Sequence, residues 1–136
     1  MIQLFRMSIA ALALMIGVSS TLSAQNEQQT EKEFYESIDS QVNRLADLLD
    51  LNDAQIFYVD SILVHDYGAM QAELKEMQDK KVSNPDLYYD IQFKWQDQVY
   101  YSFQKIFDED QWARYLKSGA ERDKKNRDKK RAKAGK

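Results

Sequence analysis

The chain has 136 residues and no cysteine, which excludes disulfide bonds and a lipid anchor on cysteine. The formal charge of −3 averages two unlike parts: residues 25–116 hold 8 Lys/Arg and 19 Asp/Glu, a net of −11, whereas residues 117–136 hold 10 Lys/Arg and 3 Asp/Glu, a net of +7. A single histidine and the lack of a glycine-rich phosphate loop give no support to nucleophilic catalysis or nucleotide chemistry, so we expect neither an enzyme nor a cofactor.

The first 24 residues have the pattern of an export signal. Arg6 precedes an apolar run of 12 residues over 7–18, and the segment ends in small residues at Ala24. The run is shorter than the ~20 residues that a membrane-spanning helix needs. We therefore expect a signal peptide that is cleaved after Ala24, and not an uncleaved anchor. The polar residues 25–30 are expected to be disordered.

Four helices are expected over residues 31–117, which makes the fold class all-α, a helical hairpin or bundle with a long central helix and no β-sheet. Apolar residues recur every three to four positions over 31–50 and 86–106, and at near-heptad spacing over 52–81. The only proline, Pro85, suits the first turn of a helix. The fourth helix is short and begins at Asp108.

The helix over 86–106 carries more apolar residues than one buried face requires. The first stripe comprises Tyr88, Ile91, Trp95, Val99 and Ile106, and the second comprises Tyr89, Phe93, Tyr100, Phe103 and Phe107. We interpret part of the second stripe as a candidate protein-binding surface formed by Tyr89, Phe93, Tyr100 and Phe103. Its occupant would be a second copy of the chain or a client protein. The alternative is a helix that is simply central in its own bundle.

A short pattern occurs twice in the chain, 56 residues apart. It reads Leu51-Asn52-Asp53-Ala54-Gln55 in the first copy and Phe107-Asp108-Glu109-Asp110-Gln111 in the second. In each copy an Asn or Asp that can cap a helix is followed three positions later by Gln, which is the spacing of a capping box. Apolar residues flank both boxes, as in a hydrophobic staple. The pattern therefore predicts two helix joints.

The two copies resemble degenerate forms of the paired LTxxQ motif of the Spy/CpxP family. Leu51, Gln55 and Gln111 match that motif outright, whereas the residues at 52, 107 and 108 are substitutions that keep the capping and staple chemistry. The resemblance covers most of the mature chain, from the first motif to the basic tail. It implies a small helical protein of the bacterial periplasm, in which the helix-joint residues are structural. Those residues are Leu51, Asn52, Gln55, Phe107, Asp108 and Gln111.

The resemblance also implies a range of functions. Spy-like members are ATP-independent chaperones that act as antiparallel homodimers, and CpxP-like members damp an envelope-stress sensor kinase. We expect a homodimeric chaperone for unfolded envelope proteins, with a regulatory or structural partner in envelope-stress signalling as the alternative. Other relatives bind or sense zinc, nickel or cobalt. A metal-responsive sensor fits worst, because His65 is the only histidine and metal sites need several ligands.

The basic tail over 118–136 contains no large apolar residue, so we expect it to be disordered or a frayed helix. It can make a weak contact with an anionic membrane surface or an acidic protein. It can also fold back on the acidic body and neutralise it, which is the interpretation we favour. Nucleic acid is not expected as a partner, because the tail lacks interleaved aromatic residues.

The two joints give a first prediction. Asn52→Ala and Asp108→Ala are each expected to lower the free energy of unfolding by roughly 0.5–2 kcal/mol, because each removes the side chain that caps a helix. Thermal or chemical denaturation of the purified protein measures the change. Unchanged stability in both variants would show that these residues are not caps.

Overall fold

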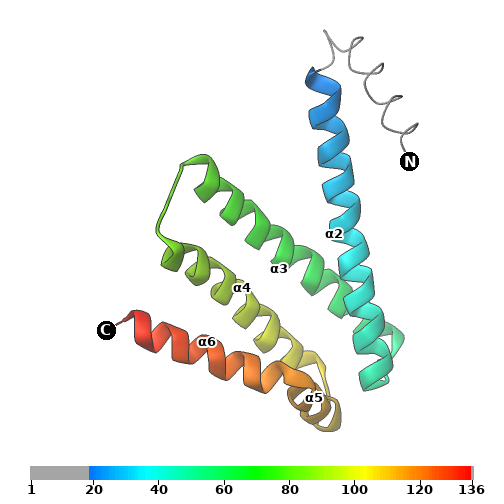
Figure 1. Cartoon of the computed structure of the whole chain (residues 1–136). Helices are drawn as coiled ribbons and strands as arrows, with labels where there is room; N and C mark the ends of the chain where they lie inside the picture. Colours follow the sequence, from blue (N-terminus) through cyan, green and yellow to red (C-terminus); the bar gives the residue numbers. More distant parts are fainter. Residues whose placement is uncertain (1–18, 136) are drawn as a thin grey trace, which may run out of the picture. The chain divides into compact units, whose positions relative to one another are not determined.

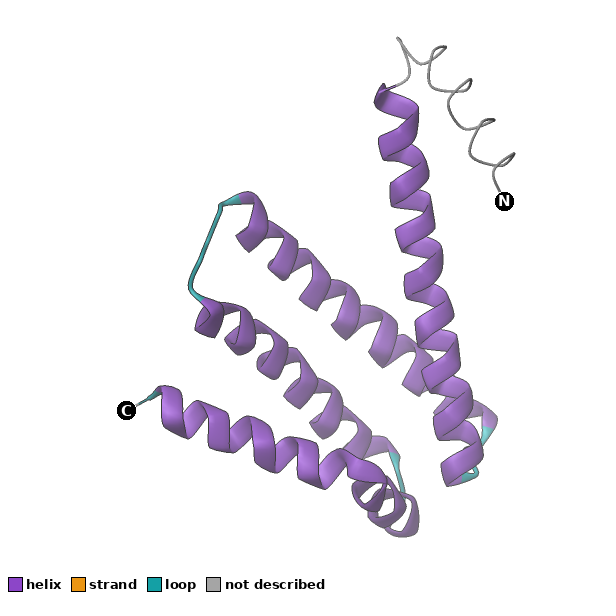
Figure 2. Cartoon of the chain, in the orientation of Figure 1, coloured by secondary structure: helices purple, strands orange, loops and turns teal. Residues whose placement is uncertain are grey.

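The computed structural model describes residues 19–135, with side chains from Ala24 onward. Residues 1–18 of the expected signal peptide thus lie outside the described residues. The elements are α2 (Ser19–Leu49), α3 (Asp53–Asp79), α4 (Pro85–Ile106), α5 (Glu109–Tyr115), the π-helical turn η2 (Leu116–Ala120) and α6 (Glu121–Ala134). Every regular element of residues 19–135 is a helix (Figure 2), which confirms the all-α fold. None of these helices is long and apolar enough to cross a bilayer.

Two compact units divide the chain, and their boundary falls inside α2, between Glu36 and Ser37. The described part of the first unit is the N-terminal half of α2. It includes residues 25–30, which are helical here although the sequence predicted disorder. The physical reason is local, because pairs at helical spacing hold the segment: Gln29 donates to Glu33 at 2.8 Å and Thr30 donates to the Asn26 carbonyl at 2.8 Å.

In the second unit α3 and α4 form an antiparallel hairpin (Figure 1). Just after α3, Lys81 adopts the left-handed conformation, with a φ of 56°. The amide of Val82 then donates to the Met77 carbonyl at 3.0 Å, as in a Schellman motif. Asn84 caps α4 by accepting from the Asp86 amide at 3.0 Å, and Pro85 occupies the first turn. The stop and start expected near Pro85 are both present.

The core of the second unit draws on the C-terminal half of α2, on α3 and on α4. Its buried apolar residues are Ile38, Val42, Leu45, Leu49, Leu51, Val59, Leu63, Val99, Phe103 and Phe107. The residues of α2 in this set belong to the apolar face that its spacing predicted. The core therefore ends at the two helix joints, where Leu51 and Phe107 are buried beside the polar Gln111.

The chain does not become disordered after the fourth predicted helix. Gly119 adopts a φ of +123°, which non-glycine residues rarely adopt, and breaks the helical path between α5 and α6. Helix α6 then runs back along α4 (Figure 1). Ion pairs at i,i+4 spacing support it, including Lys124 with Asp128 at 2.8 Å and Lys125 with Glu121 at 3.3 Å. The tail is thus a packed helix.

Candidate functional site

Both predicted capping boxes are present. Asn52 accepts from the Gln55 amide at 2.9 Å, and the Gln55 side-chain oxygen accepts from the Asn52 amide at 3.1 Å. In the second joint, Asp108 accepts from the Gln111 amide at 2.8 Å, and the Gln111 side-chain oxygen accepts from the Asp108 amide at 3.0 Å. The repeated pattern therefore starts α3 and α5 in the same way.

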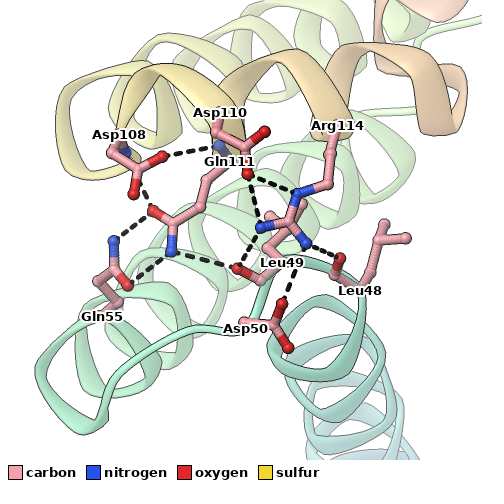
Figure 3. A network of polar contacts seen from close by, with 8 residues as sticks. All are labelled: Leu48, Leu49, Asp50, Gln55, Asp108, Asp110, Gln111 and Arg114. Atoms are coloured by element: carbon pink, nitrogen blue, oxygen red, sulfur yellow. Dashed lines mark hydrogen bonds and ion pairs between the residues drawn. The ribbon is translucent and has the colours of Figure 1, made fainter.

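The two glutamines also bind each other across the joints (Figure 3). Gln55 Nε2 donates to Gln111 Oε1 at 2.7 Å, and Gln111 Nε2 donates to Gln55 Oε1 at 3.1 Å. The second hydrogen of each amide goes to the carbonyl of the last residue of a helix. Gln55 donates to Ile106, at the end of α4, at 3.0 Å, and Gln111 donates to Leu49, at the end of α2, at 3.2 Å. Each amide thus uses two donors and two acceptor positions. We call this arrangement the glutamine clasp.

Arg114 extends the clasp to the end of α2 (Figure 3). Its guanidinium donates to the carbonyls of Leu48 at 2.9 Å and Leu49 at 3.3 Å, and it pairs with Asp50 at 3.2 Å and Asp110 at 2.9 Å. A cation at the C-terminus of a helix is favourable because unpaired carbonyls carry partial negative charge there. The sequence analysis missed this residue, although it lies one helical turn after Gln111 and so shares its face.

The clasp is a structural device. Gln111 is only 5% exposed, and the staple residues Leu51 and Phe107 are 9% and 7% exposed. Such burial leaves no room for a client at these positions. The six predicted helix-joint residues therefore lie together, where they hold the ends and starts of four helices.

The four aromatic residues proposed as a protein-binding surface do not share one open face, so that prediction is wrong in part. Phe103 is 1% exposed and packs in the core against Phe107 and Tyr115. Tyr100 is half-buried, with its ring centroid 4.9 Å from that of Trp112. Both stripes contribute to the core, Val99 from the first and Phe103 from the second, so only the tertiary packing decides which residues of each stripe are buried.

Tyr89 and Phe93, the other two members of the set, lie beneath the basic helix α6. Lys130 Nζ is 3.1 Å from the centroid of the Tyr89 ring, and the Arg131 guanidinium is 5.4 Å from that of Phe93. Both are cation–π contacts, in which the negative face of the ring attracts the charge. Two residues of the second stripe therefore contact the chain's own tail, and Tyr89 remains 38% exposed.

Asp97 continues this row one turn further along α4 and is enclosed by cations. Arg127 Nε lies 2.9 Å from Asp97 Oδ1, Arg131 lies 2.6 Å from Oδ2 and Lys124 lies 3.6 Å from Oδ2. Lys124 also lies 5.5 Å from the ring centroid of Tyr101, the next residue of the row. Burial alone would raise the pKa of the Asp97 carboxyl, but the hydrogen bonds from Arg131 and Arg127 outweigh it and hold the pKa below its ordinary value.

We call Tyr89, Phe93, Asp97 and Tyr101 the α4 row; they are spaced by four residues and so share one helix face. The sequence analysis found its first two members and missed Asp97 and Tyr101. The tail itself held a signal for them: its cations at 124, 127 and 131 recur at spacings of three and four residues. Such a stripe of cations on one helix predicts acidic and aromatic residues on the helix that it packs against. The α4 row is the candidate functional site.

His65, the single histidine, is not part of a metal site in the described residues. Its side chain is 75% exposed, and its Nδ1 lies 2.7 Å from Asp66. Across residues 19–135, no group of three or more His, Cys, Asp or Glu side chains is placed to hold a metal ion.

Comparison with known proteins adds no relative: no family model matches the chain, and neither a curated protein nor a solved structure is significantly similar to it.

The glutamine clasp leads to a second prediction. Gln111→Ala and Gln55→Ala are each expected to destabilise the protein by roughly 1–3 kcal/mol, since each removes hydrogen bonds to backbone groups at the helix ends, some of them part-buried. Gln111→Ala should cost more, because Gln111 is the more buried of the two. The double variant should cost less than the two single changes combined, because the amides bond each other. Urea denaturation of the four proteins measures the coupling, and strict additivity would contradict the clasp.

A third prediction concerns the hold of Asp97 on α6. Because the folded pKa of Asp97 is below its ordinary value of 3.8, its contribution is complete above about pH 4 and is lost as the pH falls through the lower folded pKa. Asp97→Asn should release α6 at neutral pH, and added salt should do so in part. Limited trypsin digestion of α6 measures the release. Asp47→Asn, an exposed position on α2, is the control and should leave the digestion rate unchanged.

Proposed function

We propose that the chain is an exported, Spy/CpxP-like protein-binding module that holds unfolded envelope proteins without ATP. One observation carries the proposal: the α4 row is occupied by a helix that contains no apolar residue larger than alanine. A surface that binds a basic segment of its own chain through rings and a carboxylate has the chemistry to bind basic segments of other proteins. Helix α6 then acts as a cover that a client replaces.

The cover is held by polar contacts. An exposed cation–π contact is worth about 0.5–1 kcal/mol. The ion pairs of Asp97 are largely buried, with 15% of its side chain exposed, so salt screens them less than exposed pairs. Helix α6 brings no large apolar side chain, so the hydrophobic effect adds little to its docking. A client segment that carries both cations and apolar residues can gain hydrophobic burial that α6 cannot. Replacement of α6 by a client is therefore favoured for unfolded chains, whose apolar residues are exposed.

Further contact area lies on α3. Phe57 and Tyr58 are 66% and 53% exposed, and their rings form an edge-to-face pair with centroids 5.8 Å apart. Exposed aromatic side chains are common anchors in protein interfaces. The resemblance to Spy-like proteins supports a homodimer as the working form. Weak, mixed contacts of this kind suit many clients rather than one.

The fourth prediction tests the cover in an aggregation assay with a chemically denatured client. The variant Lys130→Gln/Arg131→Gln removes the cations above Tyr89 and Phe93 and should suppress aggregation at a lower molar ratio than the wild type. Lys129→Gln/Lys133→Gln is the matched control, because it removes the same charge from exposed positions of the same helix. It should behave as the wild type.

Failure of both the wild type and the uncovered variant to protect several unrelated clients would contradict the chaperone proposal. A pull-down from envelope extracts separates the alternative. One dominant partner, lost when residues 117–136 are deleted, would favour a regulatory module with a dedicated envelope partner.

A further inference from the structure

A polar pocket of about 370 Å³ lies in the second unit, next to the contact between α4 and α6. It is bounded by the C-terminal half of α2, by α3 and α4, and by the turn from η2 into α6. The lining residues that carry its chemistry are Gln41, Arg44, Tyr67, Gln96, Tyr115 and Arg127. The volume is in the range of sites for small organic ligands. The pocket is separate from the α4 row and from the glutamine clasp.

Two arginines reach this pocket from different helices. Arg127, on α6, binds Asp97 through Nε, which leaves its two terminal nitrogens to point elsewhere. Arg44, on α2, forms no ion pair with the residues that the structure describes. Arg44, Arg127 and the half-buried Tyr115 line the same pocket. An anion at this point would meet two guanidinium groups.

The tyrosines of the pocket are neutral donors. Burial raises the pKa of Tyr115 to about 12, and it raises the pKa of Tyr67 as well. Both phenols therefore keep their protons at any physiological pH, so they donate hydrogen bonds and carry no negative charge. The amides of Gln41 and Gln96 add two more groups that can donate.

The charged residues that line the pocket carry a net positive charge, unlike the acidic body of the chain. Asp123 is the one acidic residue that lines it, and Asp123 lies 3.4 Å from Arg122, a cation outside the lining. The remaining charged lining residues are Arg44 and Arg127. A cavity with two cations and several neutral donors is matched to oxygen anions, since guanidinium groups bind carboxylate and phosphate oxygens in pairs.

We propose that this pocket binds a small organic oxyanion, a carboxylate or a phosphate monoester, between Arg44 and Arg127, with the hydroxyls of Tyr67 and Tyr115 as further donors. The anion bridges α2 and α6. This inference does not require the proposed chaperone activity, although Arg127 also binds Asp97 of the α4 row.

The fifth prediction tests the pocket by thermal denaturation and calorimetry of the full mature chain. Citrate and glucose 6-phosphate are the carboxylate and phosphate probes; glucose and sodium chloride at matched ionic strength are the controls. At least one anion should raise the melting temperature saturably, beyond the effect of chloride. Arg44→Gln should weaken its affinity about tenfold or more, because a charge-assisted pair is lost. Tyr67→Phe should weaken it less.

Lys105→Gln removes the same charge from an exposed site outside the pocket and should keep the wild-type affinity. Saturable binding by citrate alone would assign the site to carboxylates, and by glucose 6-phosphate alone to phosphate esters. The proposal is overturned if neither anion binds saturably, or if Arg44→Gln binds as tightly as the wild type. Aggregation assays do not enter this test, so its failure would leave the proposed function standing.

Discussion

The reciprocal hydrogen bonds between Gln55 and Gln111 are the interaction on which the rest of the second unit depends. Helix ends carry unpaired backbone groups, and burying them without partners is costly. Two side-chain amides satisfy the starts of α3 and α5 and the last carbonyls of α2 and α4 in one connected set. Because the set closes on itself, the four helix termini are fixed relative to one another. The positions of the core, the α4 row and the pocket follow from that geometry.

The periodicity of the sequence was sufficient to predict the helices and both joints, because helices and capping boxes are determined by residues that are close in the sequence. Capping boxes and apolar spacing act within a few residues, and they predicted the starts of α3 and α5 and the turn at Pro85 correctly. The clasp itself was not predictable, because the pairing of Gln55 with Gln111 is a contact over 56 residues. The resemblance to Spy/CpxP proteins singled out the same glutamines but assigned them no partner.

The errors occurred where charge replaces apolar packing. Helix α6 has no apolar periodicity, so a hydrophobic pattern could not reveal that it packs on α4. The residues that make this packing possible are spread over two segments. They are the cations at 124, 127 and 131 of the tail and a carboxylate with aromatic rings on α4. The prediction that Phe103 is part of a binding surface was wrong for the opposite reason. Phe103 belongs to the same predicted stripe as Tyr89 and Phe93, but it lies in the core whereas Tyr89 and Phe93 contact the tail.

Arg127 connects the two candidate sites, because its Nε binds Asp97 while the same side chain lines the pocket. An anion at its terminal nitrogens leaves the bond to Asp97 in place and adds a link from α6 to Arg44 on α2. Such a ligand binds the covered form more tightly than a form in which α6 has left α4. Linkage is reciprocal, so a client that displaces α6 must weaken anion binding by the same factor by which the anion weakens client binding. On the two proposals together, a helix held by ion pairs and cation–π contacts is subject to control by a small charged molecule.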